Sequence, residues 1–369
     1  MKHTGKIIVA GHVCLDITPV FSGGTSLSGL DELLVPGKLI NVASANVHTG
    51  GCVANTGLAL KALGNDVTLM GKIGDDFFGK IIQQSFAQYH AGGLIVDEAS
   101  ATSYSVVLAV PGVDRIFLHC PGANDTFTGK DIPDGALADA ALFHFGYPPL
   151  MRTMFENGGK ELASLLSSMK ARGIATSLDF AAIDPASEAG KVDWTALLAN
   201  VLPYTDFFVP SFEELCFMLD RENYDRLKLY GGDMIGHLDM DRDVKPLAEK
   251  ALALGCNAIL IKCGTAGMYF RTGSMARVGL RLPLDRNEWA EQEVFQPCFK
   301  AEILRSATGT GDASIAAFLS AVLCGKKPAE CTALAAAEGA CAVTAYDALS
   351  GLLSLEELEK KIAAGWPHQ

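Results

Sequence analysis

The sequence predicts an α/β protein built on a doubly wound, mainly parallel β-sheet. Short, continuously apolar segments alternate with longer segments of helical periodicity. Continuously apolar strands separated by helices are typical of a parallel sheet that is covered on both faces. The length of 369 residues suits one large α/β domain or two ordinary domains, and we expect a single domain over 1–369.

The apolar segments come in an order that alternates strand and helix. The predicted strands cover residues 7–11, 67–73, 141–145, 174–178, 206–209 and 258–261. The predicted helices include 53–63, which ends at Gly64, and about 155–171.

Two segments, about 17–48 and 102–120, do not fit this series. The first has a Gly/Ser-rich loop at 22–26 and an expected strand at 39–42, and the second reads as a hairpin that turns at Pro111-Gly112. We expect them to form a small antiparallel β-lid over one end of the sheet, the alternative being an extension of the edge of the main sheet. Stretches at about 220–245 and 272–300 are expected to be surface insertions.

Composition limits the function. The net charge is −12 and the pI about 5.1, which argues against a broad nucleic-acid surface, because such surfaces cluster Lys and Arg. The longest apolar stretch, 316–324, is far shorter than the ~20 residues of a membrane span. The ten cysteines include no C-x-x-C pair and are expected to be buried, reduced side chains. We therefore expect a soluble, cytoplasmic protein with a small-molecule ligand and no membrane or nucleic-acid partner.

A first glycine-rich segment, 74–81, matches part of a phosphate-binding loop. The pattern requires Ser or Thr where this sequence has Ile81, and Asp75 and Asp76 would repel a phosphate. We interpret the segment as a helix start, with the two carboxylates at the helix N-terminus and Phe77 and Phe78 packing against the protein.

A second glycine-rich segment, 307–312, is a stronger candidate. It follows an expected strand at 303–304 and opens a helix with an apolar stripe. Unpaired N–H groups at this helix start would form an anion hole, and Asp312 could accept a proton from an attacking hydroxyl. Two other interpretations remain: a dinucleotide-binding turn, and a plain turn in which Asp312 only caps the helix.

At this point the chain resembles the PfkB/ribokinase-like family of carbohydrate kinases. One motif is Ser306-Ala307-Thr308-Gly309-Thr310-Gly311-Asp312, close to the family's D-T-x-G-A-G-D. The other is Gly50-Gly51-Cys52-Val53-Ala54-Asn55, continuing through 63–64 and 71–79. The resemblance covers about 6–348 and implies a Rossmann-like, ribokinase-like domain with a small β-lid. It also implies transfer of a phosphoryl group from ATP to a sugar or nucleoside hydroxyl.

The resemblance assigns roles to individual residues. Asp312 matches the catalytic base, and Gly309, Thr310 and Gly311 match the anion hole. Residues that match substrate ligands are Asp16, Gly50, Gly51 and Asn55. Glu214, in Ser211-Phe212-Glu213-Glu214, matches a residue that acts on Mg²⁺ through water, and the nucleotide-side matches are Lys262, Gly264 and Gly267. The small-residue helix 337–343 would flank adenine.

The sequence departs from the family pattern at Ser306 and Ala307. Relatives use this region to bind a monovalent cation, so potassium activation is doubtful. A nucleoside kinase, a non-catalytic sugar- or nucleotide-binding sensor and an NAD-linked enzyme remain alternatives. Tyr104 and Phe117 of the lid either line the substrate or only pack, and the lid could form a homodimer interface.

Overall fold

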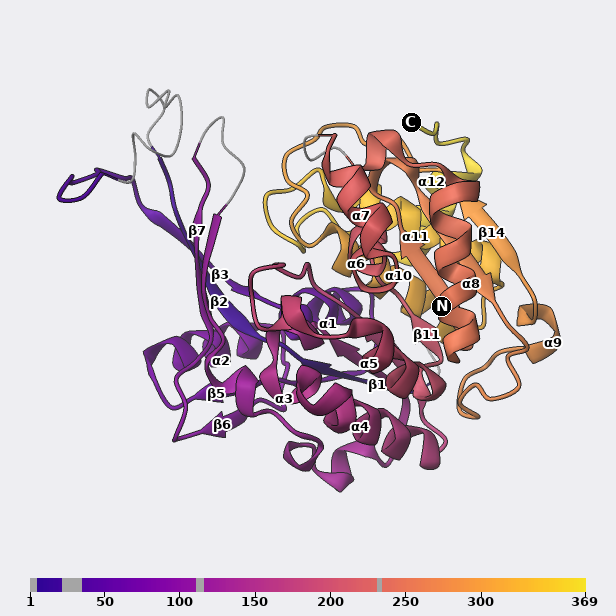
Figure 1. The fold of residues 1–369 in the computed structure, drawn as a ribbon, viewed down its shortest axis with the longest axis horizontal. Helices are drawn as coiled ribbons and strands as arrows, with labels where there is room; N and C mark the ends of the chain where they lie inside the picture. Colours follow the sequence, from indigo (N-terminus) through magenta and orange to yellow (C-terminus); the bar gives the residue numbers. More distant parts are fainter. Residues whose placement is uncertain (1–4, 22–34, 111–115, 231–233) are drawn as a thin grey trace.

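The protein has a central eight-stranded sheet with helices on both faces and a smaller sheet that projects from one edge (Figure 1). The computed structural model describes residues 5–21, 35–110, 116–230 and 234–369. The predicted loop at 22–26 and the turn at Pro111-Gly112 lie outside the described residues.

The central sheet confirms the predicted fold class. Its strand order is β14-β13-β12-β11-β10-β9-β1-β4, parallel from β12 to β4, with β13 and β14 added antiparallel at one edge. The strands are β1 (Lys6–Gly11), β4 (Val67–Met70), β9 (Ala140–Gly146), β10 (Ala175–Asp179), β11 (Phe207–Phe208), β12 (Ala258–Lys262), β13 (Met268–Thr272) and β14 (Glu293–Gln296).

The two faces of this sheet bury separate apolar cores. Ile7 and Val9 of β1 face one core, and Ile8 and Ala10 face the other, as the period of two in a strand requires. The first core is covered by α1 (Cys52–Ala62), α2 (Phe77–Gln88), α10 (Thr310–Leu323), α11 (Pro328–Ala342) and α12 (Leu355–Ala363). The second is covered by α3 (Arg152–Phe155), α4 (Lys160–Ala171), α5 (Trp194–Val201), α6 (Phe212–Leu219), α7 (Arg221–Lys228) and α8 (Lys245–Leu254).

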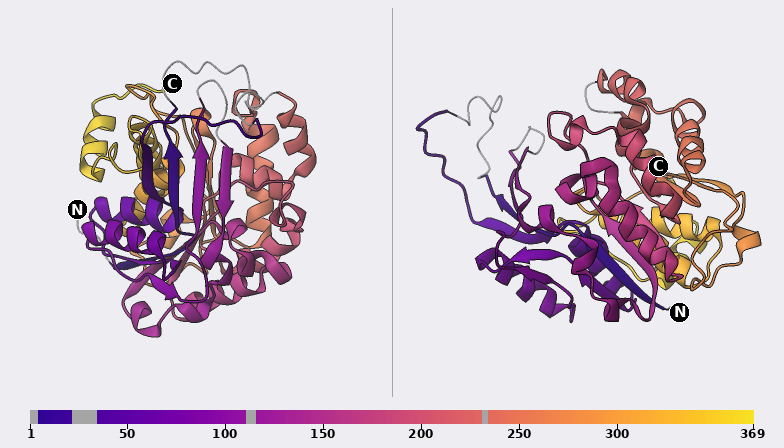
Figure 2. Two further views of the ribbon diagram at one scale, coloured as in Figure 1. Left: turned by 90° about the vertical axis from the view of Figure 1, so that its left-hand side faces the viewer. Right: turned by 60° about the horizontal axis from the view of Figure 1, so that its bottom comes forward.

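The smaller sheet is the predicted lid. Its order is β3-β2-β7-β8, with antiparallel outer pairs and a parallel middle pair. The strands are β2 (Cys14–Pro19), β3 (Ala45–Gly50), β7 (Tyr104–Leu108) and β8 (Ile116–Cys120), and they stand together away from the body (Figure 2). A separate pair, β5 (Lys72–Gly74) and β6 (Ile95–Asp97), lies at the foot of the lid.

Several local predictions were wrong. Residues 39–42 and 303–304 are not strands; Leu39 and Leu304 are 85% and 77% exposed, so these apolar residues have neither a neighbouring strand nor a core to join. The predicted strand 67–73 is two strands in different sheets, because the chain leaves the central sheet at Gly71.

The two stretches predicted as surface insertions lie partly in the interior. Within 272–300, β14 extends the central sheet, and the buried Trp289 of α9 (Arg286–Trp289) packs edge-on against Phe207. Within 220–245, Asp243 and Val244 are buried.

The segment 74–81 is a helix start, as predicted. Asp76 is the N-cap of α2, and its carboxylate accepts hydrogen bonds from Gly79 N at 2.8 Å and Thr102 N at 2.7 Å. Phe78 packs against Tyr104, but Phe77 is 74% exposed, so its predicted packing was wrong.

All ten cysteines are free, seven of them buried and three half-buried. Within the described residues, every helix is too short or too polar to cross a membrane.

Candidate active site

The candidate site lies at the carboxyl ends of the parallel strands, where the predicted motifs meet. Gly309 is the N-cap of α10 and has a φ of 73°, so the helix begins at Thr310 and Asp312 falls in its first turn. The helix is buried on all sides from Asp312 to Leu323, rather than along the single predicted stripe, because α1 and α11 both pack on it. Asp312 is therefore held in the interior at the start of a buried helix.

Asp312 accepts hydrogen bonds from three side chains. Asn55 Nδ2 donates to Oδ2 at 3.2 Å, Thr56 Oγ1 donates to Oδ1 at 2.7 Å, and Tyr147 Oη donates to Oδ2 at 2.7 Å. Asn55 and Asp312 are 257 residues apart in sequence, so this contact joins the two predicted motifs. Burial raises the pKa of Asp312, while the three donors and the Lys262 ammonium oppose that rise.

Tyr147 was not predicted. It directly follows β9 and has a left-handed backbone with φ 66° and ψ 42°, which is rare for an aromatic residue. Such strain persists where the surroundings enforce it and is often found at functional sites. Here it brings the phenol onto Asp312. The position after a predicted parallel strand was the signal that could have found it.

A buried ion pair lies beside the predicted anion-hole loop, 309–311. Lys262 Nζ is 2.7 Å from Asp179 Oδ1, and a Cβ added at Gly311 would be 3.7 Å from Lys262 Nζ. Burial acts to lower the pKa of Lys262, but Asp179 and Glu214 outweigh it and raise the pKa, so the amine stays charged. Asp179, the last residue of β10, was also missed by the sequence analysis.

Glu214 lies in the first turn of α6. Its Oε2 accepts a hydrogen bond from Ser211 N at 2.7 Å, and Ser211 Oγ accepts one from Glu214 N, which makes a capping box. The Glu214 carboxylate also interacts electrostatically with Lys262 and Asp179, and it acts to raise the pKa of both. The described residues contain no group of three or more His, Cys, Asp or Glu side chains that could hold a metal ion.

Gly264 and Gly267 close the turn after Lys262. They have φ values of 52° and 114°, and Cys263 N donates to Gly267 O across the turn between β12 and β13. A Cβ at Gly267 would come within 2.2 Å of Gln296 O, so the turn itself requires glycine there. Their predicted role in nucleotide binding stays a prediction.

Asp16 lies at the root of the lid, on β2. It faces Ser105 of β7 and His48 of β3 in the sheet register, and Cys14 Sγ donates to its Oδ1 at 3.4 Å. Burial raises the pKa of Asp16. A Cβ at Gly50 would come within 2.2 Å of Asp16 Oδ2, so the absence of a side chain at position 50 makes room for this carboxylate.

Gly51, next to Gly50, caps α1 with a φ of 84°. A Cβ there would come within 2.5 Å of His12 O, whose carbonyl accepts the hydrogen bond from Val53 N. The two glycines therefore let the start of α1 approach the joint between β1 and β2.

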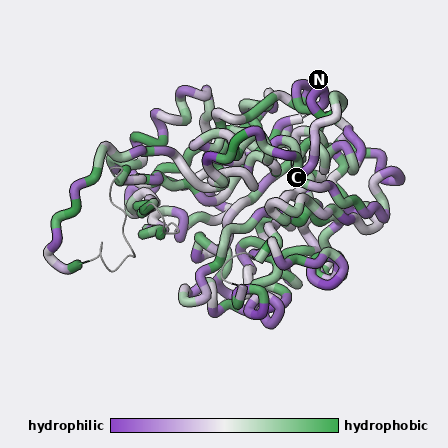
Figure 3. Tube along the Cα trace, turned by 90° about the horizontal axis from the view of Figure 1, so that it is seen from above, coloured by the Kyte–Doolittle hydropathy of each residue, from purple (hydrophilic) through white to green (hydrophobic). Residues whose placement is uncertain are grey.

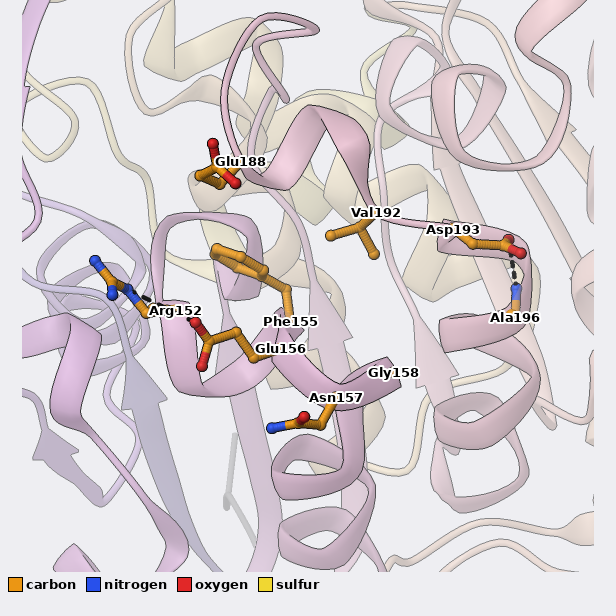
Figure 4. A pocket seen from close by; sticks show the side chains of 9 residues that line it. All are labelled: Arg152, Phe155, Glu156, Asn157, Gly158, Glu188, Val192, Asp193 and Ala196. Atoms are coloured by element: carbon orange, nitrogen blue, oxygen red, sulfur yellow. Dashed lines mark hydrogen bonds and ion pairs between the residues drawn. The ribbon is translucent and has the colours of Figure 1, made fainter.

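A separate pocket of about 610 Å³ opens beside α3 and α5 (Figure 4). Its lining residues are Arg152, Phe155, Glu156, Asn157, Gly158, Glu188, Val192, Asp193 and Ala196. None of them is a predicted site residue, and the charged ones are exposed. The pocket is distinct from the residues around Asp312.

The sequence model of the pfkB family of carbohydrate kinases matches residues 13–354. The chain therefore belongs to the pfkB family of carbohydrate kinases.

Individual relatives agree with this assignment. An uncharacterized sugar kinase of Archaeoglobus fulgidus is 25% identical over 299 residues, covering 80% of this chain and 98% of that protein. Fructokinase-1 of Zea mays is 24% identical over 144 residues, which cover 38% of this chain and 41% of the fructokinase.

Solved structures share the fold. A ribokinase of Arabidopsis thaliana complexed with ribose and ATP has a TM-score of 0.71 at 18% identity, over 97% of this chain and 98% of that one. A fructokinase of Xylella fastidiosa with bound ATP has a TM-score of 0.71 at 19% identity, over the same shares of the two chains.

Proposed function

We propose that this protein is an ATP-dependent sugar kinase in which Asp312 is the base for the acceptor hydroxyl. The observation that carries the proposal is the buried Asp312 carboxylate, held by three side-chain donors at the start of α10. A carboxylate accepts about four hydrogen bonds, so three donors leave a place for the acceptor hydroxyl. The raised pKa of Asp312 makes it a better proton acceptor than an ordinary carboxylate.

The helix start supplies the attraction for phosphate. The first N–H groups of α10 have no carbonyl partner within the helix, and the positive end of the helix dipole lies behind them. Thr310 Oγ1 is buried without a hydrogen-bond partner in the described structure, a state that a bound ligand would relieve. With Lys262 next to Gly311, these groups would stabilise charge on a transferred phosphoryl group.

The residues fit a magnesium ion that is held mainly by water and phosphate oxygens. Glu214 would act on it through water, since its carboxylate is already engaged at the α6 cap and lies within the field of Lys262 and Asp179. Such an ion would neutralise charge on the β- and γ-phosphates. Gly264 and Gly267 would face the nucleotide.

The acceptor would bind on the lid side of Asp312. Asp16 offers a carboxylate at the root of the lid, and Gly50 and Gly51 let α1 approach it. The ribose in the Arabidopsis ribokinase and the ATP in both solved kinases support a sugar acceptor and ATP here. Asn55 would connect the acceptor side to the base, since it donates to Asp312.

The proposal is tested by ADP release from Mg-ATP with hexoses, pentoses and nucleosides as acceptors. We expect release that depends on a sugar and is lost in the Asp312→Asn variant. ATP, but not NAD, should raise the melting temperature of the wild type. Turnover of nucleosides alone, or binding of sugars and ATP without turnover, would contradict the proposal.

We also propose that a second copy of the chain packs on the lid. Val47 and Leu118 of the lid strands are 45% and 56% exposed and share one face of the lid sheet, because both lie in register with Ile17 and Val106, and hydrophobic stretches continue along the projecting segment (Figure 3). Light scattering should show a dimer that Leu118→Asp converts to a monomer; an unchanged mass would contradict this interface.

A further inference from the structure

His12 is a buried histidine without a hydrogen-bond partner. It is 2% exposed, and neither Nδ1 nor Nε2 has a partner within the described structure. A buried polar group left without a partner destabilises the folded protein. A ligand that hydrogen-bonds the His12 imidazole would account for this buried residue without a partner.

His144 provides a comparison within the same molecule. It is also fully buried, but its Nδ1 is 3.0 Å from Ser177 Oγ, so only Nε2 is without a partner. His144 can thus be explained as an interior residue with a local partner, whereas His12 cannot.

His12 lies between the lid and the candidate base. It occupies the two-residue joint between β1 and β2. Its ring centroid is 6.1 Å from that of Tyr147, whose hydroxyl donates to Asp312, and 5.3 Å from that of His119 on β8. His119 is exposed and its Nδ1 is 3.0 Å from Ser105 Oγ, so the ring beside His12 reaches solvent.

His12 and the neighbouring His119 carry no positive charge at neutral pH. Burial and the neighbouring His119 lower the pKa of His12 to about 3, and burial also lowers that of His119. A neutral imidazole offers one donor and one acceptor, which suits a hydroxyl group. Asp16 and Asp312 form no ion pair within the described residues. Two carboxylates and neutral rings favour uncharged hydroxyls and would repel a sugar acid or a sugar phosphate.

We propose that His12 determines acceptor specificity by hydrogen-bonding a hydroxyl group of an uncharged sugar that binds between the lid and Asp312. This inference rests on the proposed kinase function. The exposed His119 ring, which lies beside His12, would move aside or share the contact when the sugar enters.

The test compares wild type with His12→Leu on a parent sugar and its set of monodeoxy analogues. For the wild type, one analogue should lose at least about tenfold in kcat/KM beyond the others. In His12→Leu, the parent sugar should lose a similar factor, the selective penalty for that analogue should vanish, and the KM for ATP should stay within about twofold. A purely structural role would not erase the penalty at one hydroxyl position.

His144→Leu is the matched control, because it makes the same change at a buried histidine that has a protein partner. It should keep the analogue pattern. Without substrate, His12→Leu should melt at or above the wild-type temperature, since it removes unpartnered polar atoms, whereas His144→Leu should melt lower.

The outcomes separate the two proposals. If wild type turns over no sugar, the kinase function fails before His12 is at issue. If wild type is active and His12→Leu keeps both the acceptor KM and the analogue pattern, or if a sugar acid is the best acceptor, the inference on His12 is wrong and the kinase function stands.

Discussion

Two helix starts in this molecule look alike in sequence and differ in structure. Each combines glycines and aspartates at the start of a helix: Asp76 is the N-cap of α2, and Asp312 lies within the first turn of α10. Asp76 is half-buried and accepts from backbone N–H groups of Gly79 and Thr102, which outweigh its burial and lower its pKa. Asp312 is buried and accepts from side chains, and burial raises its pKa.

The contrast shows that burial and the donors together set the pKa of a carboxylate at a helix start, and hence what that carboxylate can do. Backbone amides fix a carboxylate in its charged form as a cap. Side-chain donors in a buried site hold it in place but leave its proton affinity high, as a base requires.

The sharpest test of this contrast is Asp312→Asn. The change keeps the shape and removes the proton acceptor, so we expect kcat to fall by about 10²–10⁴-fold or more while the sugar still binds. Steady-state kinetics and sugar-induced shifts of the melting temperature measure the two effects. An unchanged kcat would remove Asp312 from the chemistry.

The backbone of the α10 start is tested by Gly309→Ala with Gly311→Ala as its pair. Gly309 has a φ of 73°, and a Cβ there would come within 2.4 Å of Ala348 Cβ, whereas a Cβ at Gly311 meets its nearest atoms at 3.7 Å. We expect Gly309→Ala to lower the free energy of unfolding by roughly 1–3 kcal/mol and to reduce kcat. Gly311→Ala should leave stability unchanged in denaturant titrations; equal losses in both would contradict this account.

The role of the side-chain donors is tested by Tyr147→Phe. The phenol lowers the pKa of Asp312, so its loss should raise that pKa further. Because the base must be deprotonated, the acid limb of the pH profile of kcat/KM should move to higher pH. The loss of kcat/KM should be largest at low pH. Tyr224→Phe, in α7 beside Phe217, should leave the limb in place. A limb that moves to lower pH would contradict the assignment.

The smallest effect is expected at the other helix start. Asp76→Ala removes an N-cap and leaves Thr102 N without its acceptor, so unfolding should become easier by about 1–2 kcal/mol with kcat unchanged. Asp75, exposed and 3.8 Å from Lys80, is the control, and Asp75→Ala should change stability by less than about 0.5 kcal/mol. A large loss of kcat in Asp76→Ala would contradict the view that Asp76 serves only as a helix cap.

The sequence predicted the central sheet, the lid, and Asp312 and Asn55, because each leaves a periodic or a motif signal. It did not predict that Thr56, Tyr147 and Asp179 lie at the candidate site, since each is a single polar residue that only its position, at a strand end or beside Asn55, could have marked. Their place is set by parallel strands that end at one edge of the sheet. The strands predicted at 39–42 and 303–304 are absent from the structure. Local apolar character does not make a strand where no neighbouring strand is available to pair with it.

The joint between β1 and β2 has a mechanical consequence. Only His12 and Val13 separate a strand of the central sheet from a strand of the lid, and the buried Asn124 side chain bonds both Val13 N, at 3.2 Å, and Val13 O, at 2.9 Å. The lid therefore cannot swing without turning the backbone that carries His12. With the role proposed for His12, lid position and acceptor occupancy are linked, so a change far out on the lid that biases its angle would alter sugar affinity, and a bound sugar would bias the lid by the same free energy.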